Sequence, residues 1–219
     1  MYFIKPAMED ILIIKKLTVG PIMANCFIIG CERTKEAVVI DPGDEADKIL
    51  ISLAEAKLKV RYIINTHGHF DHVGGNKKLK EVTGADLLIH PLDAPLLGQL
   101  STSAAAWGLP MENSPLPDRT VEDDDIITFG DITFKVIHTP GHSPGGISLY
   151  TDGNVFVGDT LFEGSIGRTD FPGGDYNTLI SSIQKKLFVL GDDVNVFPGH
   201  MGNTTIGKEK RFNPFLNQL

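Results

Sequence analysis

Cysteine is scarce in this chain, which carries only Cys26 and Cys31 among its 219 residues. Two cysteines are too few for the disulfide framework of a small secreted protein. They do not form a Cys-x-x-Cys pair, and neither has an adjacent histidine that would activate a thiolate. We therefore predict that both are small apolar residues that pack in the interior.

Long hydrophobic runs are also missing near the start of the chain. The longest purely aliphatic run there covers residues 11–14, and the acidic residues Glu9 and Asp10 come directly before it. Such a run resembles neither the apolar core of a signal peptide nor a membrane span. The expectation is a soluble cytoplasmic protein with no membrane partner.

Positive charge is in short supply, with 20 Lys and Arg residues against 28 Asp and Glu residues and a formal net charge of -8. A surface of this kind repels a phosphate backbone, so nucleic acid is not an expected partner. The one short basic group, Lys208, Lys210 and Arg211, is interpreted as a solvated face.

The residues that are present predict an α/β fold. With 42% hydrophobic and 22% charged residues, the chain can form one domain over residues 1–219, although two domains are not excluded. Helical spacing predicts helices over 45–56, 75–83 and 176–187. Short β-branched runs predict strands, and their alternation with helices indicates sheets covered by helices. These runs are 11–19, 26–29, 37–40, 61–65, 86–89, 132–137, 147–150, 155–157 and 194–197.

Two stretches lack a regular pattern. Residues 97–119 carry three prolines, and a long loop of this kind is either a lid that faces substrate or a plain surface excursion. The sequence leaves both possibilities open. The acidic run 122–125 is interpreted as a solvated turn before the strand that begins near Ile132.

Three of the seven histidines fall within one hexapeptide, His67-Gly-His69-Phe-Asp71-His72. The hexapeptide follows a predicted strand and precedes Gly74, Gly75 and a predicted helix. A tight loop after a strand can direct several side chains toward one point, and glycines let the backbone turn closely around it. The motif therefore predicts a metal site.

Further candidate ligands repeat this placement at the ends of strands. His142, Asp159 and His200 each follow a predicted strand, at the edge where ligands usually bind in such folds. Five imidazoles and two carboxylates suit zinc, and also iron or manganese. His90 and His138 also end strands, but we interpret both as hydrogen-bonded packing residues near the site.

Five segments together resemble the metallo-β-lactamase fold superfamily, and within it the short bacterial glyoxalase II-like hydrolases. The resemblance runs from about Leu17 to Leu219. The segments are THGHFDHVGG at 66–75, HTPGHSPGG at 138–146, GDTLF at 158–162, SIGRTDF at 165–171 and PGH at 198–200.

This resemblance implies an αββα sandwich and a pair of divalent metal ions, most often Zn²⁺. By the family's scheme, His67, His69 and His142 hold the first metal. Asp71, His72 and His200 hold the second, and Asp159 bridges the two. Asp71 and Asp159 are the predicted catalytic residues. Arg168 and Asp170 either orient the ligands, hold a substrate carboxylate, or simply fix their own loop.

Departures from related families narrow the expected reaction. Metallo-β-lactamases lack a bridging carboxylate at the position of Asp159, which disfavours antibiotic hydrolysis. Persulfide dioxygenases, which use one iron, typically have a cysteine where this chain has Ile166. A mononuclear iron dioxygenase is the main alternative, and a metal-binding protein without turnover is a weaker one.

The expected reaction is hydrolysis of a small-molecule thioester, as in hydroxyacylglutathione hydrolases. Two cations lower the pKa of a bridging water to around 7, and the resulting hydroxide attacks the thioester carbonyl. The sequence after His200 leaves little room for the helical region with which longer glyoxalase II enzymes grip glutathione. The thiol of the substrate and the oligomeric state therefore stay open.

Overall fold

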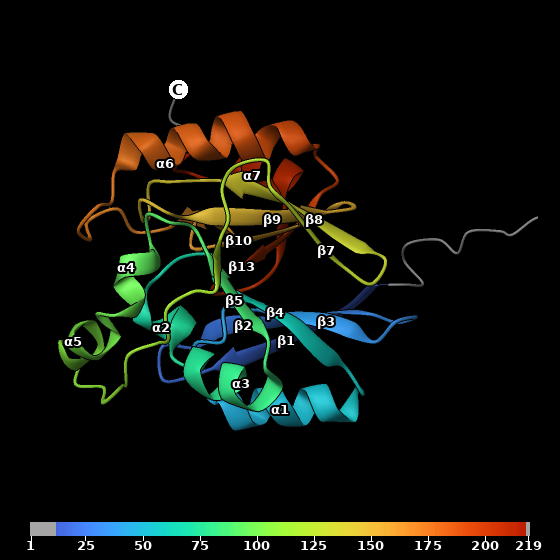
Figure 1. Ribbon diagram of the computed structural model, residues 1–219. Coiled ribbons are helices and arrows are strands. Elements are labelled where there is room, and N and C mark those ends of the chain that lie inside the picture. The colour runs from blue at the N-terminus through green and yellow to red at the C-terminus, as the bar shows by residue number, and fades with distance from the viewer. Residues whose placement is uncertain (1–11, 218–219) are drawn as a thin grey trace, which may run out of the picture.

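The computed structural model describes residues 12–217, which form two mixed sheets with helices on their outer faces (Figure 1). The first sheet has the order β1-β2-β3-β4-β5-β6. Its first three strands pair antiparallel and the remaining pairs are parallel. The strands are β1 (Leu12–Val19), β2 (Ala24–Cys31), β3 (Glu36–Ile40), β4 (Lys59–Ile64), β5 (Asp86–Ile89) and β6 (Arg119–Thr120).

The second sheet has the order β14-β13-β10-β9-β8-β7. Only β10 and β13 pair in parallel, and the other neighbours are antiparallel. Its strands are β7 (Ile126–Phe129), β8 (Ile132–His138), β9 (Ile147–Thr151), β10 (Asn154–Gly158), β13 (Asn195–Pro198) and β14 (Thr204–Thr205). A small hairpin of β11 (Leu161–Phe162) and β12 (Ser165–Ile166) follows β10.

Helices cover the outer face of each sheet. In Figure 1, α1 and α3 lie below the first sheet, and α6 lies above the second. The helix α6 continues through a π-helical turn, Ile183–Leu187, and a 3₁₀ turn, Phe188–Leu190. The helices are α1 (Ala46–Glu55), α2 (Phe70–Val73), α3 (Asn76–Thr83), α4 (Ala94–Leu97), α5 (Leu100–Ala105), α6 (Tyr176–Ser182) and α7 (Ile206–Phe212).

Three apolar layers hold these elements together. The middle layer lies between the sheets, where Phe27 and Ile64 of the first sheet face Phe134 and Phe156 of the second. The two outer layers pack each sheet against its helices, as Leu53 of α1 does beneath the first sheet. Burial of apolar area on both faces of both sheets supplies the main driving force for this four-layer arrangement.

The predicted αββα sandwich is confirmed, and so is the packing role of both cysteines, which are buried. The predicted strands and helices are all present, and their ends differ by two residues at most when the π-helical turn that continues α6 is included. Residue 11, at the start of the first predicted strand, lies outside the described residues. Residues 122–125 form the expected turn, but the strand that follows is β7 rather than β8.

The prediction that residues 97–119 are irregular was wrong in part, because α5 lies within them. Its sequence, Leu-Ser-Thr-Ser-Ala-Ala, is only six residues long and contains a Ser-Thr-Ser run of lower helix propensity, so the local signal is weak. Leu100 and Ala104, one helical turn apart, are buried in the first outer layer. Tertiary packing therefore stabilises a helix that the sequence pattern does not reveal.

Among residues 12–217, none of the helices is long and apolar enough to cross a membrane.

Candidate metal centre

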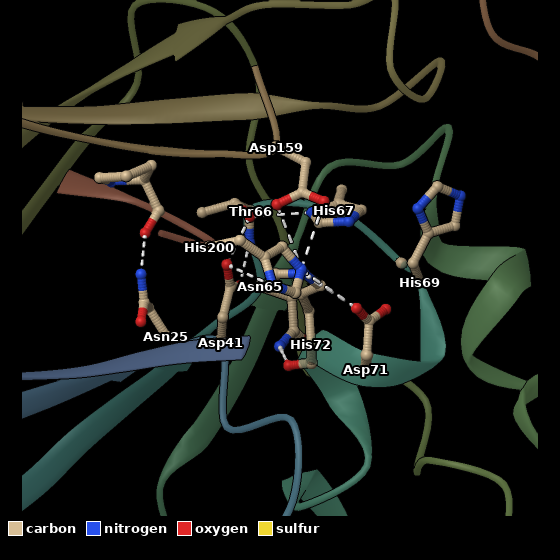
Figure 2. Close-up of polar contacts among 12 residues, drawn as sticks. Asn25, Asp41, Asn65, Thr66, His67, His69, Asp71, His72, Asp159 and His200 are labelled. Carbon is tan, nitrogen blue, oxygen red and sulfur yellow. Dashed lines mark hydrogen bonds and ion pairs between the residues drawn. The ribbon is translucent and has the colours of Figure 1, made fainter. Parts of the chain in front are cut away.

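Seven predicted site residues meet where four strands end. His67, His69, Asp71 and His72 lie on the loop and the short helix α2 that follow β4. The other three follow β8, β10 and β13 of the second sheet, and they are His142, Asp159 and His200. Figure 2 shows the side chains of Asp71, His72, Asp159 and His200 facing one another across the gap between the sheets.

The first group of potential ligands consists of His67, His69 and His142, whose donor atoms lie within 4.8 Å of one another. The Nδ1 atom of His69 is 2.9 Å from the Nε2 atom of His142. Ligand atoms around a tetrahedral zinc ion are about 3.4 Å apart, given metal–nitrogen distances of about 2.1 Å. This group therefore has the spacing of a metal site.

The second group consists of Asp71, His72 and His200, also with donor atoms within 4.8 Å of one another. The Nε2 atom of His200 lies 3.2 Å from both the Nε2 atom of His72 and the Oδ2 atom of Asp71. Two imidazoles and one carboxylate form a donor set that zinc, iron and manganese all accept.

Asp159 lies between the two groups and reaches both. Its Oδ2 atom is 3.6 Å from Nε2 of His142, in the first group, and 3.6 Å from Nε2 of His200, in the second. Its Oδ1 atom is 3.5 Å from Nε2 of His72. A carboxylate in this position can offer one oxygen to each of two cations.

Hydrogen bonds behind the histidines fix their tautomers. Asp41 accepts a hydrogen bond from the hydroxyl of Thr66 at 2.6 Å, so the Thr66 oxygen accepts a hydrogen bond from Nδ1 of His67, 3.0 Å away. Nδ1 of His72 donates to Asp41 at 3.2 Å. In both rings the Nε2 atom then faces the cluster, which is the arrangement of carboxylate–histidine–metal triads.

His142 is oriented in the same way by the backbone. Its Nδ1 atom donates to the carbonyl of Arg168 at 2.7 Å, which leaves Nε2 as the atom that faces Asp159. The approach of the His200 loop requires a glycine next to the histidine. A Cβ atom on Gly199 would lie 2.3 Å from Oδ1 of Asp159 and 2.7 Å from Cε1 of His72, so any larger residue would displace the candidate ligands.

Two orphaned atoms show that the cluster suits a cation. Nε2 of His67 and Oδ1 of Asp159 are buried, and neither has a hydrogen-bond partner among residues 12–217. Buried polar atoms without a partner are costly, so native structures rarely retain them without a ligand. Metal ions at the two groups would coordinate both atoms, and the residues present therefore fit a two-metal site.

The electrostatics of the two groups differ. Burial and the neighbouring imidazoles lower the pKa of His67 well below its usual value, and the same causes lower the pKa of His69 to about 4. Burial also opposes the charged form of His72, but Asp71 and Asp159 outweigh it and raise its pKa to about 10. Nearby carboxylates likewise raise the pKa of His200 despite burial, and His72 and His200 lower the pKa of Asp71. His67 and His69 are therefore neutral at pH 7, whereas the second group holds at least one proton.

Three buried polar residues around the site were not predicted from the sequence. Asp41 is one of them, although it follows β3 as the candidate ligands follow their strands. Asn25 donates to the carbonyls of Pro198 and Met201, on either side of His200, at 2.9 and 3.1 Å. The third is Asp93, whose carboxylate accepts bonds only from residues at least 25 positions away among residues 12–217.

The other singled-out residues lie around the site rather than in it. His90 and His138 stack with ring centroids 4.2 Å apart, and each makes a hydrogen bond, which confirms their packing role. Arg168 pairs with Asp170 through two bonds and lies over the ring of Phe171. The exposed basic side chains of α7 all pair with carboxylates, with Lys208 on Glu163 and both Lys210 and Arg211 on Asp192.

The irregular part of residues 97–119 reaches the site. Leu109 and Met111 line a small apolar crevice together with Ile22, Phe70 and Asp71, one of the candidate ligands. This contact places part of the segment next to the site. A role as a lid that faces substrate stays a prediction.

Comparison with known proteins identifies the family. The sequence profile described as the Metallo-beta-lactamase superfamily matches residues 19–200, which is most of the chain. The chain belongs to the metallo-beta-lactamase superfamily. Within this superfamily it is 42% identical over 208 residues to hydroxyacylglutathione hydrolase GloC of Haemophilus influenzae, a match that covers 93% of this chain and 98% of that protein.

Two solved structures from the superfamily superpose closely. TTHA1623, crystallised in a di-iron-bound form, is 42% identical with a TM-score of 0.85, and the match covers 92% of this chain and all of the other. The B3 metallo-beta-lactamase BLEG-1 is 36% identical with a TM-score of 0.88, and the match covers 94% of this chain and all of the other.

Proposed function

We propose that this chain is a binuclear metallohydrolase that cleaves thioesters of 2-hydroxy acids, with S-lactoylglutathione as the reference substrate. One observation carries the proposal: two three-residue groups of potential ligands lie on either side of Asp159, which reaches both. The similarity to GloC of Haemophilus influenzae supports the substrate class.

The proposed ligands are divided between two divalent metal ions. His67, His69 and His142 hold the first, Asp71, His72 and His200 hold the second, and Asp159 bridges them. Bound metal ions would supply a nucleophilic hydroxide near neutral pH and polarise the thioester carbonyl. We propose zinc for both positions, and the di-iron form of TTHA1623 supports iron as an alternative at this donor set.

The protein contributes position and charge. Asp41 and the Arg168 carbonyl hold the rings of His72 and His142 in their ligating tautomers, so no reorganisation is needed when substrate arrives. Phe171 lies edge-on to His69, with ring centroids 5.3 Å apart, and supplies an apolar wall beside the first group. A thioester with a short acyl chain would meet this wall as its carbonyl approaches the site.

Substrate selectivity is expected to be broad on the thiol side. Arg168 and Lys208, two cations near the site loops, are already paired with Asp170 and Glu163, so little charge is free to bind the carboxylates of glutathione. Because weaker uniform binding raises KM before it affects kcat, we expect KM for S-lactoylglutathione near the upper end of the usual range, about 1 mM. Thioesters of other thiols should then differ by less than about tenfold in kcat/KM.

Steady-state kinetics on a panel of substrates tests the proposal. The panel contains lactoyl thioesters of several thiols, a chromogenic cephalosporin and a persulfide. The cephalosporin is included because of the similarity to BLEG-1, and an oxygen electrode follows oxygen uptake with the persulfide. Thioester hydrolysis should dominate. Oxygen uptake or cephalosporin cleavage in the absence of thioester cleavage would overturn the assignment.

The pH dependence of metal binding should differ between the two groups. A proton must leave His72, whose pKa is raised to about 10, before its Nε2 atom can bind a metal ion. The affinity of the second group for a metal ion should therefore rise about tenfold per pH unit from pH 7 to 9. The metal affinity of the first group should change little with pH, because the pKa values of His67 and His69 are already lowered.

Isothermal titration calorimetry in buffers of different ionisation enthalpy counts the protons released. At least one should leave with the metal that binds the second group, and close to none with the other. Equal proton release at both steps would contradict the division of charge between the two groups.

A further inference from the structure

Asp93 is a buried carboxylate that the proposed reaction does not use. It lies in the turn after β5, directly before α4, and its exposed fraction is 0%. None of the ion pairs among residues 12–217 involves it, although a buried carboxylate without a cation is expensive. Such a group persists only where its hydrogen bonds compensate for the lost hydration.

Three donors surround this carboxylate, and they come from two different loops. The backbone N–H of Gly68 donates to Oδ2 at 2.9 Å, and the hydroxyl of Ser143 donates to the same oxygen at 2.7 Å. The backbone N–H of Gly145 donates to Oδ1 at 2.6 Å. Bonds to an ionised acceptor are about twice as strong as neutral ones.

The two loops are those that carry the first group of proposed ligands. Gly68 lies between His67 and His69, on the loop after β4 of the first sheet. Ser143 follows His142 directly, on the loop after β8 of the second sheet. None of the hydrogen bonds of Asp93 reaches Asp71, His72 or His200. The carboxylate thus joins both halves of one proposed metal site and neither half of the other.

The fit around Asp93 is tight. A Cβ atom on Gly145 would lie 2.7 Å from both the backbone nitrogen and Oδ1 of Asp93, so the loop approaches as closely as a glycine allows. A backbone bond from Ile147 to the Thr66 carbonyl, 2.8 Å long, also joins the two loops, but Ile147 lies five residues beyond His142. The Asp93 bonds, by contrast, reach Gly68 next to His69 and Ser143 next to His142.

We propose that Asp93 is a positioning residue that sets the geometry of the first metal site by clamping the His67–His69 loop to the His142 loop. This inference rests on the proposed assignment of His67, His69 and His142 to one metal ion. Loss of an outer hydrogen-bond partner typically weakens metal binding 10–100-fold. The Asp93 clamp should act on one of the two metals and spare the other.

The substitution Asp93→Asn tests this role. An amide in this place can accept bonds only at its oxygen, and its NH₂ group would face an N–H or hydroxyl donor. Glu209→Gln is the matched control, because Glu209 is also buried and also accepts three bonds, from Gly164, Thr204 and Asn213. Both variants replace a buried carboxylate by an amide, but Gly68 and Ser143 are directly next to proposed ligands, whereas the partners of Glu209 lie at least four residues from any of them.

The readout is titration of the metal-free proteins with Co²⁺, followed by visible absorption and by competition with a chelator. Wild type and Glu209→Gln should bind two ions with matching spectra. Asp93→Asn should bind one ion as wild type does, and the other about 10–100-fold more weakly with an altered absorption band. Ser143→Ala, which removes one of the three bonds, should show the same selective effect at a smaller size, and it carries the test if Asp93→Asn does not fold.

Two failures can be told apart. If wild type binds fewer than two Co²⁺ ions, the proposed metal centre is wrong. If wild type binds two but Asp93→Asn weakens both equally, or neither, the proposed role of Asp93 is wrong while the metal centre stands. A selective effect of equal size in Glu209→Gln would also overturn the role of Asp93.

Discussion

Replacing Asp159 with alanine should lower kcat/KM for thioester hydrolysis by about a thousandfold, equivalent to about 4 kcal/mol of transition-state stabilisation. The carboxylate reaches both groups of proposed ligands, and in the described part of the chain its buried Oδ1 atom has no hydrogen-bond partner. Its removal would leave each metal ion one ligand short and would release the constraint on their separation, about 3.5–4 Å in two-metal sites. Bound metal should also fall, which mass spectrometry of the native protein can measure.

His90→Ala provides the control for this substitution. His90 is a buried imidazole that stacks on His138 and accepts a bond from the backbone of Leu92, but it belongs to neither ligand group. Its loss should leave kcat/KM within about threefold of wild type, because ordinary packing changes alter stability more than chemistry. Equal losses in Asp159→Ala and His90→Ala would mean that the ligands are assigned wrongly.

Removing the metal ions should lower the melting temperature by about 10–20 °C. At a free metal concentration of about 100 times Kd, each site contributes about 2.7 kcal/mol, and a chain of this size shifts by about 2–4 °C per kcal/mol. Without the ions, no group among residues 12–217 hydrogen-bonds to the buried atoms His67 Nε2 and Asp159 Oδ1. Thermal unfolding before and after dialysis against a chelator measures the shift.

His67→Ala is the appropriate comparison for the chelation experiment. A variant that no longer holds both ions should start from a lower melting temperature and lose less of it on chelation. A wild-type shift below about 3 °C would show that the cluster does not bind metal tightly.

The seven ligands predicted from the sequence lie together in the structure, and four of them fall within one hexapeptide. His67, His69, Asp71 and His72 can be read together, and the rest share their placement after a strand. The same rule would have found Asp41, which follows β3 directly and precedes Pro42 and Gly43. An acidic residue before Pro-Gly also suits an ordinary turn, so the placement of Asp41 does not by itself indicate a site.

Asp93 and Asn25 could not be predicted in this way. Asp93 accepts bonds from residues 25, 50 and 52 positions away, and Asn25 donates to carbonyls more than 170 positions away. Such contacts exist only once both sheets have paired. A single polar residue at a turn or in a strand carries no local pattern that reveals its distant partners.

The elements of the fold divide in the same way, into those that local sequence predicts and those that it does not. Strands rich in β-branched residues, such as β3 and β4, follow from local pattern, and β2 is buried along its entire length as its apolar run suggests. The short helices α4 and α5 and the four-residue strand β7 were not predicted, because helices and strands of this length have little stability of their own. They form where burial of residues such as Leu97 and Leu100 compensates for weak propensity.

The most direct test of a binuclear thioester hydrolase is to add metal back to the metal-free protein while following both bound metal and hydrolysis of S-lactoylglutathione. Hydrolysis should rise with added Zn²⁺ and reach its plateau at two ions per chain, as expected if both ligand groups and Asp159 act together. A plateau at one ion per chain, or two bound ions without hydrolysis of any thioester, would contradict the proposed function.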